Sequence, residues 1–549
     1  MMTLLEGADV IDGTGAERVR EDVLLDGDRI AARGRRLSVA SDVERVDLNG
    51  RVLAPGFIDI HTHYDAQIMW DPDLSPSSWH GVTTVIAGNC GFTLAPCLPR
   101  DRNALLRMLS SVEAMPIAAL NAGVEWSFET FPEYLAFIGH RPKRLNVGFF
   151  VGHTAIRTFV MGEGASDRLA TDAEIASMRA IVSEAMDSGA VGFSTSQSTG
   201  HIDGLGRPVA SRSANKAEIF GISDALRDFG RGIVEVATGP DFTPEDCASL
   251  SVRTQRPVTW IALLTQPGRP GACTATLDAL AEVDGQTIPQ ISCRPFVVAH
   301  GYEDWAQACM ISGAFTQAVG LPPSEQRELY ASPSWRDRAR NALDPDWERA
   351  MRGATIEGTW AHRDLRGVAL SEIADDRGTS VFDAFMDIGL EDDLATDWRM
   401  VLFNDDEEEL ADLLNDDRCL IGLGDGGAHL MQLCDAIYPT YLLGHWVRER
   451  RALTLERAVW CLTGQPAAAF SVLDRGRIEA GTFADLVAFD PARVGTGALQ
   501  ELTDFPAGSS RLVGESVGIE DVWVGGVAIR RSGEDLGGAR PGRMISVGA

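Results

Sequence analysis

Eight short apolar runs, each followed by a stretch with helical spacing of apolar residues, recur between residues 53 and 470. This strand-then-helix rhythm is typical of parallel sheets, because neighbouring parallel strands must be joined by a crossover. The expected strands are 53–61, 83–87, 146–152, 190–194, 232–237, 258–264, 287–292 and 420–424. Eight such strands predict an α/β fold with a (β/α)8 TIM-like barrel, whose functional groups lie at the carboxyl ends of the strands.

Both ends of the chain read as short strands separated by turns. The first 50 residues contain the turn Asp12-Gly13-Thr14-Gly15 and the hairpin turn Asp26-Gly27-Asp28, and the stretch beyond residue 471 has a similar pattern. Two β-rich ends around an alternating middle predict that the ends pair with each other. We therefore expect residues 1–52 and 471–549 to form one discontinuous β-sandwich, which flanks a barrel of residues 53–470.

One stretch of the barrel region is too long for a single crossover. Residues 301–417 contain Pro322-Pro323 and Ser332-Pro333-Ser334, which break it into short pieces. We expect a helical insertion here. The acidic run 405–409 within it is typical of a solvated helix start rather than a metal site.

Charge and composition exclude several classes of function. The net charge of −30 argues against nucleic acid or an anionic membrane surface as a partner. No run approaches the ~18 apolar residues of a membrane span. The nine cysteines lack C-x-x-C spacing, and no basic segment precedes the first apolar run as in a signal peptide. We expect reduced thiols, a cytoplasmic location and a small-molecule substrate; association into a homo-oligomer stays open.

His61 and His63 close the apolar run 52–60 at the end of the first expected strand. Residues i and i+2 of a strand point to the same side, so both imidazoles would converge at one strand end. Imidazole is a common ligand for zinc. The pair therefore predicts a metal site at the mouth of the barrel, although two polar residues leaving a strand are the plainer alternative.

Two further residues follow barrel strands and would face the same mouth. Cys90 comes directly after the second expected strand, and thiolate is a strong zinc ligand, although a lone cysteine is more often a small buried apolar residue. Asp425 follows the last strand in Gly424-Asp425-Gly426-Gly427. It is the expected catalytic group, because its carboxylate could bind metal, take a proton from water and pass it to a leaving nitrogen. The alternative is a simple tight turn.

Five other residues are expected near the mouth and are candidates for binding substrate. Arginine grips a carboxylate through two parallel hydrogen bonds, which suggests a role for Arg157 and Arg294; rim ion pairs are equally compatible with the sequence. The histidines that follow expected strands are His153, His201 and His429. For His429 we expect contact with substrate or with Asp425 rather than with metal.

The motifs together resemble the amidohydrolase superfamily and, within it, the branch of N-acyl-D-amino-acid deacylases (D-aminoacylases). The resemblance covers nearly the whole chain. It rests on Leu53-Ala54-Pro55-Gly56-Phe57-Ile58-Asp59-Ile60-His61-Thr62-His63, Gly88-Asn89-Cys90-Gly91, Val151-Gly152-His153 with Arg157, Gly189-Ala190-Val191-Gly192-Phe193-Ser194-Thr195, Gly424-Asp425-Gly426-Gly427-Ala428-His429 and the stretch 475–487. The resemblance implies a barrel, a flanking β-sandwich and one or two zinc ions. It also implies that His61, His63, Cys90 and Asp425 bind metal.

The sequence departs from that family in two places. Many relatives bridge two metals with a lysine after strand four, but residues 191–196 contain none, so Cys90 would have to bridge. The deacylase branch supplies histidines from strands five and six, whereas 232–239 and 256–267 contain none. Glu235 is the strand-five candidate for a ligand; pairing with an arginine such as Arg294 and a surface position are its alternatives.

We expect a metal-dependent amidohydrolase that cleaves a non-peptide C–N bond, the amide of an N-acyl amino acid or a similar small acylated amine. The missing histidines keep two alternatives open. One is a hydrolase of cyclic amides, lactones or natural-product amides from the same superfamily. The other is an amidohydrolase-like scaffold without catalysis, against which the joint presence of His61, His63, Cys90 and Asp425 argues.

Overall fold

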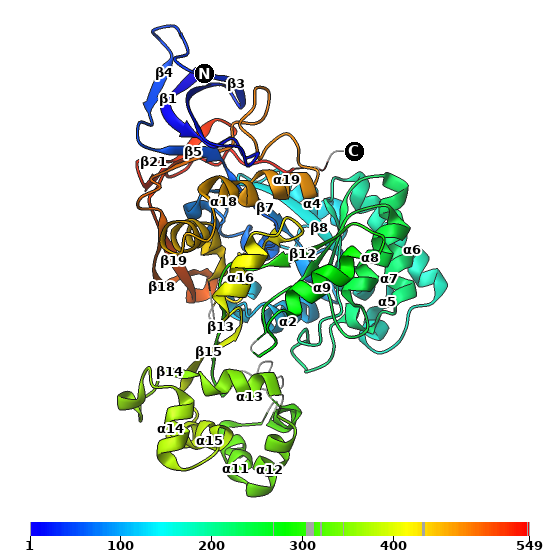
Figure 1. The fold of residues 1–549 in the computed structure, drawn as a ribbon. Coiled ribbons are helices and arrows are strands. Elements are labelled where there is room, and N and C mark those ends of the chain that lie inside the picture. The colour runs from blue at the N-terminus through cyan, green and yellow to red at the C-terminus, as the bar shows by residue number, and fades with distance from the viewer. Residues whose placement is uncertain are drawn as a thin grey trace.

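The structure is a computed structural model, and it describes residues 2–266, 268–302, 312–318, 321–343, 345–430, 434–545 and 547. Figure 1 shows a central barrel, a β-rich unit at one end of the molecule and a separate helical unit at the other. Both termini lie at the β-rich end. No helix in the described part of the chain is long and apolar enough to cross a membrane.

Eight parallel strands form the barrel wall and confirm the predicted fold class. In spatial order they are β16 (Leu420–Ile421), β12 (Thr287–Ile291), β11 (Val258–Ile261), β10 (Ile233–Ala237), β9 (Gly192–Ser196), β8 (Asn146–Gly152), β7 (Val82–Ala87) and β6 (Phe57–Asp59). The two outer strands meet just beyond their carboxyl ends, where Thr62 and Gly426 form a parallel bridge. The barrel is therefore closed at the end where chemistry is expected.

Helices cover the outside of the barrel, and local sequence signals start them. The covering helices include α4 (Phe131–Gly139), α5 (His153–Met161), α6 (Asp172–Asp187), α7 (Lys216–Phe229), α8 (Pro244–Thr254), α9 (Ala272–Ala281), α16 (Glu407–Leu414), α18 (Leu455–Leu462) and α19 (Gly464–Ala469). Thr171 and Glu174 form a capping box at the start of α6, in which each side chain satisfies a backbone N–H of the first turn. Helix α16 starts inside the acidic run, where Asp406 caps two N–H groups.

Strands from both chain ends pair in one nine-stranded sheet, as predicted. Its order is β22 (Glu534–Asp535), β21 (Val527–Arg531), β20 (Ile519–Val524), β17 (Leu486–Phe489), β5 (Val52–Pro55), β1 (Met2–Val10), β2 (Val19–Asp26) and β3 (Arg29–Gly34), and β4 (Glu44–Asp47) also pairs with β1. The central contact is β5 against β17, which joins the N-terminal and C-terminal strands. We propose that residues 1–52 and 471–549 form one domain and 53–470 the other, so that the boundary falls within β5.

The expected strand 53–61 is two strands with different partners. Strand β5 belongs to the end sheet and β6 to the barrel, and Gly56 lies between them. The Gly56 N–H donates to the Asp485 carbonyl at 2.8 Å, and a Cβ at Gly56 would lie 2.2 Å from the Thr83 side chain. Only glycine fits where the chain passes between the two sheets.

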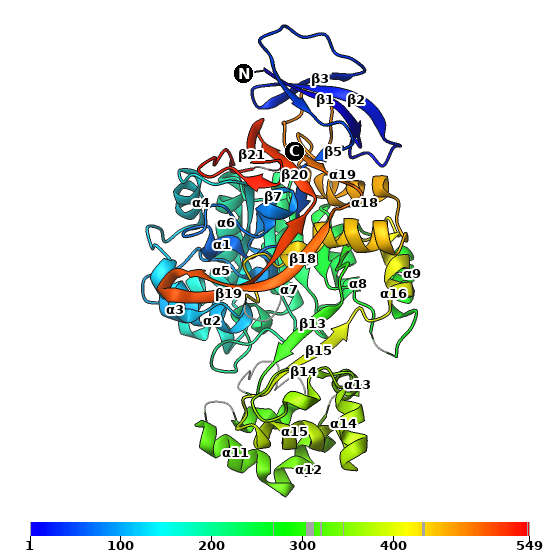
Figure 2. The same cartoon turned by 90° about the vertical axis from the view of Figure 1, so that its left-hand side faces the viewer.

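A long hairpin leaves the C-terminal strands and lies along one side of the barrel. It consists of β18 (Gly495–Phe505) and β19 (Ser509–Val517), as Figure 2 shows. The Leu512 N–H donates to the Leu430 carbonyl at 2.7 Å, which ties the hairpin to the loop after β16. This β element therefore reaches the segment that carries Asp425.

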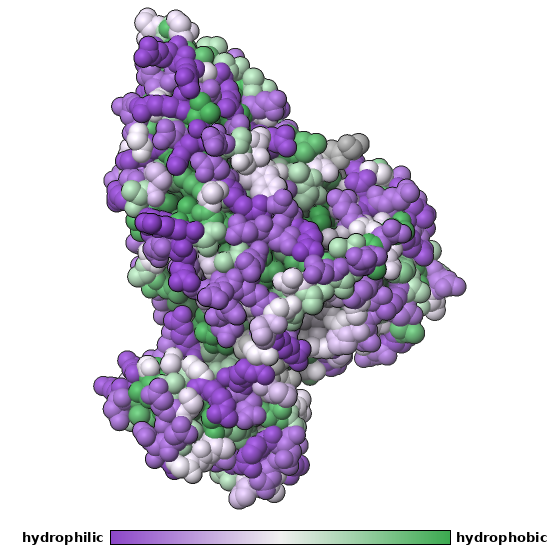
Figure 3. Space-filling model, viewed as in Figure 1, coloured by the Kyte–Doolittle hydropathy of each residue, from purple (hydrophilic) through white to green (hydrophobic). Residues whose placement is uncertain are grey.

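A separate unit lies between β12 and α16, and its bounds and content differ from those expected for a helical insertion of residues 301–417. It begins with β13 (Phe296–His300), ends with β15 (Asp397–Phe403) and contains β14 (Thr355–Gly358) as well as helices. Its α-helices, among the residues that the structure describes, are α11 (Pro323–Ala331), α12 (Pro333–Asn341), α13 (Pro345–Arg352), α14 (Leu370–Arg377) and α15 (Val381–Glu391). It has its own apolar core, which includes Trp335 and Trp398, and Figure 3 shows it joined to the barrel by a narrow waist. Helix α16 packs in the barrel core and lies outside the insertion.

Candidate metal centre

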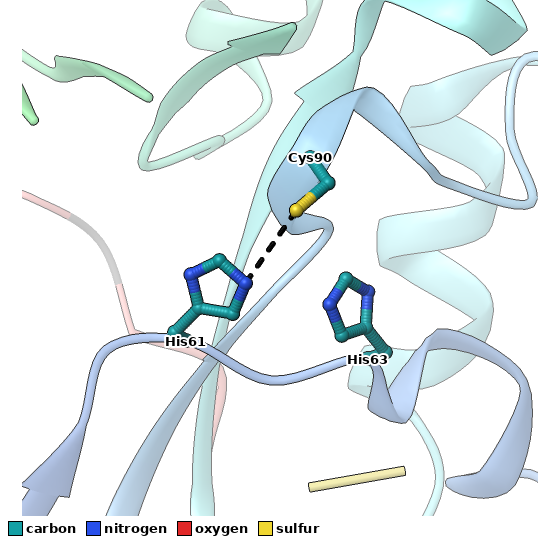
Figure 4. A group of neighbouring side chains, drawn as sticks. All are labelled: His61, His63 and Cys90. Carbon is teal, nitrogen blue, oxygen red and sulfur yellow. Dashed lines mark hydrogen bonds between the residues drawn. The ribbon is translucent and has the colours of Figure 1, made fainter. Parts of the chain in front are cut away.

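His61 and His63 lie just beyond β6, at the mouth of the barrel. Both side chains are buried, and their ring centroids are 5.3 Å apart. Cys90 comes from the short turn Asn89–Gly91 after β7. One ligand atom of each of these three residues lies within 4.8 Å of the other two, and Figure 4 shows the two imidazoles and the sulfur around a shared space. The structure thus brings together three of the predicted metal ligands.

The backbone around Cys90 is held in an uncommon conformation. Cys90 has a φ of 56°, in the left-handed region that favours glycine. Its N–H donates to Glu235 Oε2 at 2.8 Å, and its Sγ lies 3.5 Å from His61 Nε2. Glu235 is buried, and no Arg side chain lies within ion-pair distance of it in the described residues. Of its three expected settings, the structure therefore shows neither the surface position nor the pairing with Arg294.

Asp425 approaches the histidines from the loop after β16. Its N–H donates to the His61 carbonyl at 2.9 Å. Its Oδ1 lies 3.4 Å from His61 Nε2 and 3.8 Å from His63 Nε2. The side chain is 11% exposed. The carboxylate therefore faces both the mouth of the barrel and the candidate ligands His61, His63 and Cys90, which we call the metal-ligand group.

The electrostatics of this group are those of a site built for a cation. Glu113 adjoins this group, because its Oε1 lies 3.3 Å from His63 Nδ1. Burial raises the pKa of Cys90, Glu113, Glu235 and Asp425, and neighbouring acidic groups raise each pKa further. For Glu235 the pKa rises to about 8. No lysine or arginine of the described residues pairs with these acids, and burial lowers the pKa of His61 to about 4.

A divalent cation fits this donor set. Two imidazoles, a thiol and a carboxylate are the ligand types of zinc, and a cation among them would offset the cost of burying several acidic groups together. One buried carboxylate oxygen here, Glu235 Oε1, has no hydrogen-bond partner in the described structure. The residues present therefore fit a metal ion.

Sequence reasoning missed two residues that contact the histidines. Gln290 lies in β12, and its Oε1 is 3.0 Å from His61 Nδ1. A polar residue in a buried strand was the available signal. Glu113 follows α2 (Arg102–Val112), and its Oε1 is 3.3 Å from His63 Nδ1. It lies in the β7–β8 connection, where neither motif nor spacing marks it.

Of the residues expected to bind substrate, His201 and His429 lie close to this centre, and Arg294 is linked to it through Asp435. The backbone N–H of His429 donates to the Glu113 carbonyl at 2.6 Å. The His201 ring lies against Phe92 in a tilted arrangement and shares a 2.6 Å hydrogen bond with Ser196. Burial, reinforced by His429, lowers the pKa of His201 to about 3. Arg294 pairs with the buried Asp435, a neighbour of Asp425 that helps to raise the pKa of Asp425.

His153 and Arg157 lie elsewhere, in a buried network with Glu218. His153 bridges Thr195 Oγ1 at 2.8 Å and Glu218 Oε1 at 3.1 Å. The Arg157 guanidinium donates to Glu218 and, at 2.7 Å, to the Ala165 carbonyl. None of the described contacts of these two residues reaches the metal-ligand group. They join α5 to α7.

Comparison with known proteins gives a consistent result. The model of the amidohydrolase family matches residues 44–317 and 379–529, and the gap between these two matches falls in the insertion. A D-aminoacylase of Alcaligenes xylosoxydans xylosoxydans is 31% identical, covering 99% of this chain and 97% of its own. A solved D-aminoacylase with a binuclear metal centre superposes with a TM-score of 0.67, at 26% identity and 99% coverage of both chains.

A second solved structure carries a bound metal. It is the N-acyl-D-glutamate deacylase of Bordetella bronchiseptica in complex with zinc and a phosphonate inhibitor, with a TM-score of 0.66 and 26% identity over 99% of this chain and 98% of its own. The match of the family model to most of the chain and the near-complete coverage by these relatives lead to one conclusion: the chain belongs to the amidohydrolase family.

Proposed function

We propose that the protein is a metal-dependent hydrolase that cleaves the amide bond of N-acyl amino acids. The observation that carries this proposal is the convergence of His61, His63, Cys90 and Asp425 at the closed mouth of the barrel. The relatives named for deacylation of D-amino acids make N-acyl-D-amino acids the first substrates to test.

The four converging residues would hold the metal. A divalent metal held there supplies polarisation of the scissile carbonyl and activation of the attacking water. His61 Nδ1 is engaged by Gln290, which leaves Nε2 as the donor that faces Cys90 and Asp425. Cys90 adds a soft donor that favours zinc over magnesium or calcium.

Asp425 moves the proton. Its carboxylate accepts the proton of the attacking water at Oδ and then delivers it to the amide nitrogen as the C–N bond breaks. The water oxygen ends on the acyl carbon, so the products are a carboxylic acid and a free amino acid. The hydrogen bond from the Asp425 N–H to the His61 carbonyl holds the Asp425 backbone beside the proposed metal ligand.

We propose that one metal suffices for this chain. Of the two strands that carry histidines in the related deacylases, β10 offers Glu235, whose Oε2 already accepts from Cys90 N–H. Strand β11 offers Thr259, which donates to the Ile288 carbonyl at 3.0 Å. Glu235 Oε1 is the remaining donor for a second ion.

The substrate carboxylate would meet Arg294, with His201 and His429 lining the mouth. Arg294 is 16% exposed and is fixed by Asp435 and by the Cys434 carbonyl at 2.7 Å, so its direction is set before substrate binds.

The eight described cysteines are buried and form no disulfide bond, which supports our proposal of a reducing, cytoplasmic setting.

The test is turnover of paired N-acetyl-D- and N-acetyl-L-amino acids, beside cyclic amides and lactones, by zinc-loaded protein. Asp425→Asn should lower kcat at least ~10²-fold with the far-UV circular dichroism unchanged. Asp405→Asn is the matched control, because Asp405 is exposed before α16. Absence of turnover of every N-acyl amino acid, or full activity of Asp425→Asn, would contradict the proposal.

A further inference from the structure

The two histidines of the metal-ligand group are each contacted at Nδ1 by an oxygen of a different segment. For His61 that oxygen is Gln290 Oε1, at 3.0 Å. For His63 it is Glu113 Oε1, at 3.3 Å. In both rings the other nitrogen, Nε2, lies near Asp425 Oδ1, at 3.4 Å and 3.8 Å. Glu113 therefore occupies for His63 the place that Gln290 occupies for His61.

Glu113 is an unusual residue for this position. Its side chain is 3% exposed, and within the described chain His63 is the only basic side chain within 4.0 Å of its carboxyl group. A buried carboxyl without a cationic partner costs stability, so its presence calls for a compensating interaction. Nδ1 of His63 has no hydrogen-bond partner in the described structure, although Glu113 Oε1 lies 3.3 Å from it. Each group is thus the available partner of the other.

The backbone places Glu113 firmly. Its N–H donates to the Leu109 carbonyl at 2.9 Å, which ends α2, and its own carbonyl accepts the His429 N–H at 2.6 Å. The β7–β8 connection is thereby joined to the loop after β16. Because that loop also carries Asp425, the carboxylates of Glu113 and Asp425 approach His63 from two segments that are hydrogen-bonded to each other.

We propose that Glu113 is a positioning residue for the metal centre: it accepts a hydrogen bond from His63 Nδ1–H and so fixes the tautomer and ring orientation that present Nε2 to the metal. This inference rests on the proposed metal-dependent function. A carboxylate behind a ligating imidazole also makes its free nitrogen more basic, which strengthens the bond to metal. Glu113 does not touch substrate or metal in this role.

The physical basis of the proposal is tautomer selection. A neutral imidazole carries its proton on either nitrogen, and only the nitrogen without a proton can bind metal. If the proton of His63 sat on Nε2, the nitrogen nearest Asp425 could not act as a donor. An acceptor at Nδ1 removes that competing form without adding a further ligand.

The test is zinc binding by the full-length protein after metal removal. Protein stripped with a chelator is titrated with zinc chloride against a fluorescent zinc indicator. We expect Glu113→Ala to weaken zinc binding about 10- to 100-fold, the range found when such outer partners are removed. Glu113→Gln keeps an acceptor oxygen and should stay within about threefold of the unchanged protein. Glu129→Ala, at an exposed glutamate in the same connection, should have no effect.

A second measurement reads the tautomer directly. In zinc-loaded protein labelled with ¹⁵N only at histidine, long-range ¹H–¹⁵N spectra should show the His63 proton on Nδ1; Glu113→Ala should shift or broaden that signal while melting remains cooperative. Equal zinc affinity of Glu113→Ala and the unchanged protein, or a proton on Nε2 of His63, would overturn the inference and leave the proposed function standing. Failure of the unchanged protein to bind zinc would overturn both.

Discussion

Asp425 and His61 are joined twice, through the backbone and through the side chains. The Asp425 N–H donates to the His61 carbonyl at 2.9 Å, and Asp425 Oδ1 lies 3.4 Å from His61 Nε2. The first contact is part of the seam that closes the barrel between the ends of β6 and β16. Barrel closure therefore also sets the spacing between Asp425, the proposed proton-transferring group, and His61, a proposed metal ligand.

Gly424→Ala should disturb this seam. A Cβ at Gly424 would lie 2.4 Å from Asp59 Oδ2, inside the closed end of the barrel, so either the buried Asp59 carboxylate or the loop that carries Asp425 must shift. We expect a loss of about 1–3 kcal/mol in the free energy of unfolding and a larger proportional loss of zinc affinity. Urea unfolding and zinc titration measure the two effects. Gly313→Ala is the control, because no atom lies within 4 Å of its added Cβ; equal behaviour of both variants would contradict the argument.

Glu235 can hold the Cys90 turn or bind metal, and two substitutions separate these roles. Glu235→Ala leaves the Cys90 N–H buried without an acceptor. This change should lower the free energy of unfolding by about 1–3 kcal/mol and weaken zinc binding. Glu235→Gln still offers an oxygen to that N–H and should restore both properties if Glu235 only holds the Cys90 turn. A drop in zinc stoichiometry in Glu235→Gln, measured by metal analysis, would instead identify Glu235 as a ligand.

The sequence predicted the barrel more completely than it predicted the centre inside it. Strand identity follows from local apolar runs, so all eight strands could be found, and His61, His63, Cys90 and Asp425 each follow a strand directly. Glu113 belongs to a connection whose path depends on tertiary contacts, such as the hydrogen bond from His429. The role of Arg157 was open for the same reason, because its partner Glu218 lies 61 residues away.

Metal should stabilise the folded protein. A ligand that binds only the native state adds about 2.7 kcal/mol to the free energy of unfolding at a concentration 100 times its Kd. We expect a chelator to lower the melting temperature and zinc to restore it. In Cys90→Ala this zinc-dependent shift should shrink, whereas Cys247→Ala, at a buried cysteine of α8, should keep it whole. A full zinc-dependent shift in Cys90→Ala would show that Cys90 is not a ligand.

The buried network of His153, Arg157 and Glu218 should give acid-sensitive stability. Burial acts to raise the pKa of Glu218, but hydrogen bonds and charge from His153 and Arg157 outweigh it and hold the pKa below its usual value of 4.5. The stabilisation from Glu218 is therefore present above that value and is lost as the pH falls through the lower, folded-state pKa.

Removing Glu218 tests this network. Glu218→Ala leaves Arg157 buried without its counter-charge and should lower the free energy of unfolding by about 3–5 kcal/mol. Urea unfolding between pH 3 and pH 7 should show a flatter acid limb for Glu218→Gln than for the unchanged protein. Parallel acid limbs in the two proteins would show that the ionisation of Glu218 does not contribute.

Arg294 offers a test of substrate recognition that does not depend on chemistry at the metal. Its guanidinium is fixed by Asp435 and lies over the Tyr441 ring, with 5.5 Å from Cζ to the ring centroid. If it binds the substrate carboxylate, Arg294→Met should raise KM for N-acyl amino acids by about 10- to 100-fold, since hydrogen bonds to charged groups contribute roughly 1.5–3 kcal/mol. An N-acylamine that lacks the carboxylate should be hydrolysed equally by both proteins. Arg418→Met, at an ion pair outside the mouth, is the control. An equal rise in KM for the N-acyl amino acid and for the N-acylamine would instead assign Arg294 to holding Asp435 in place.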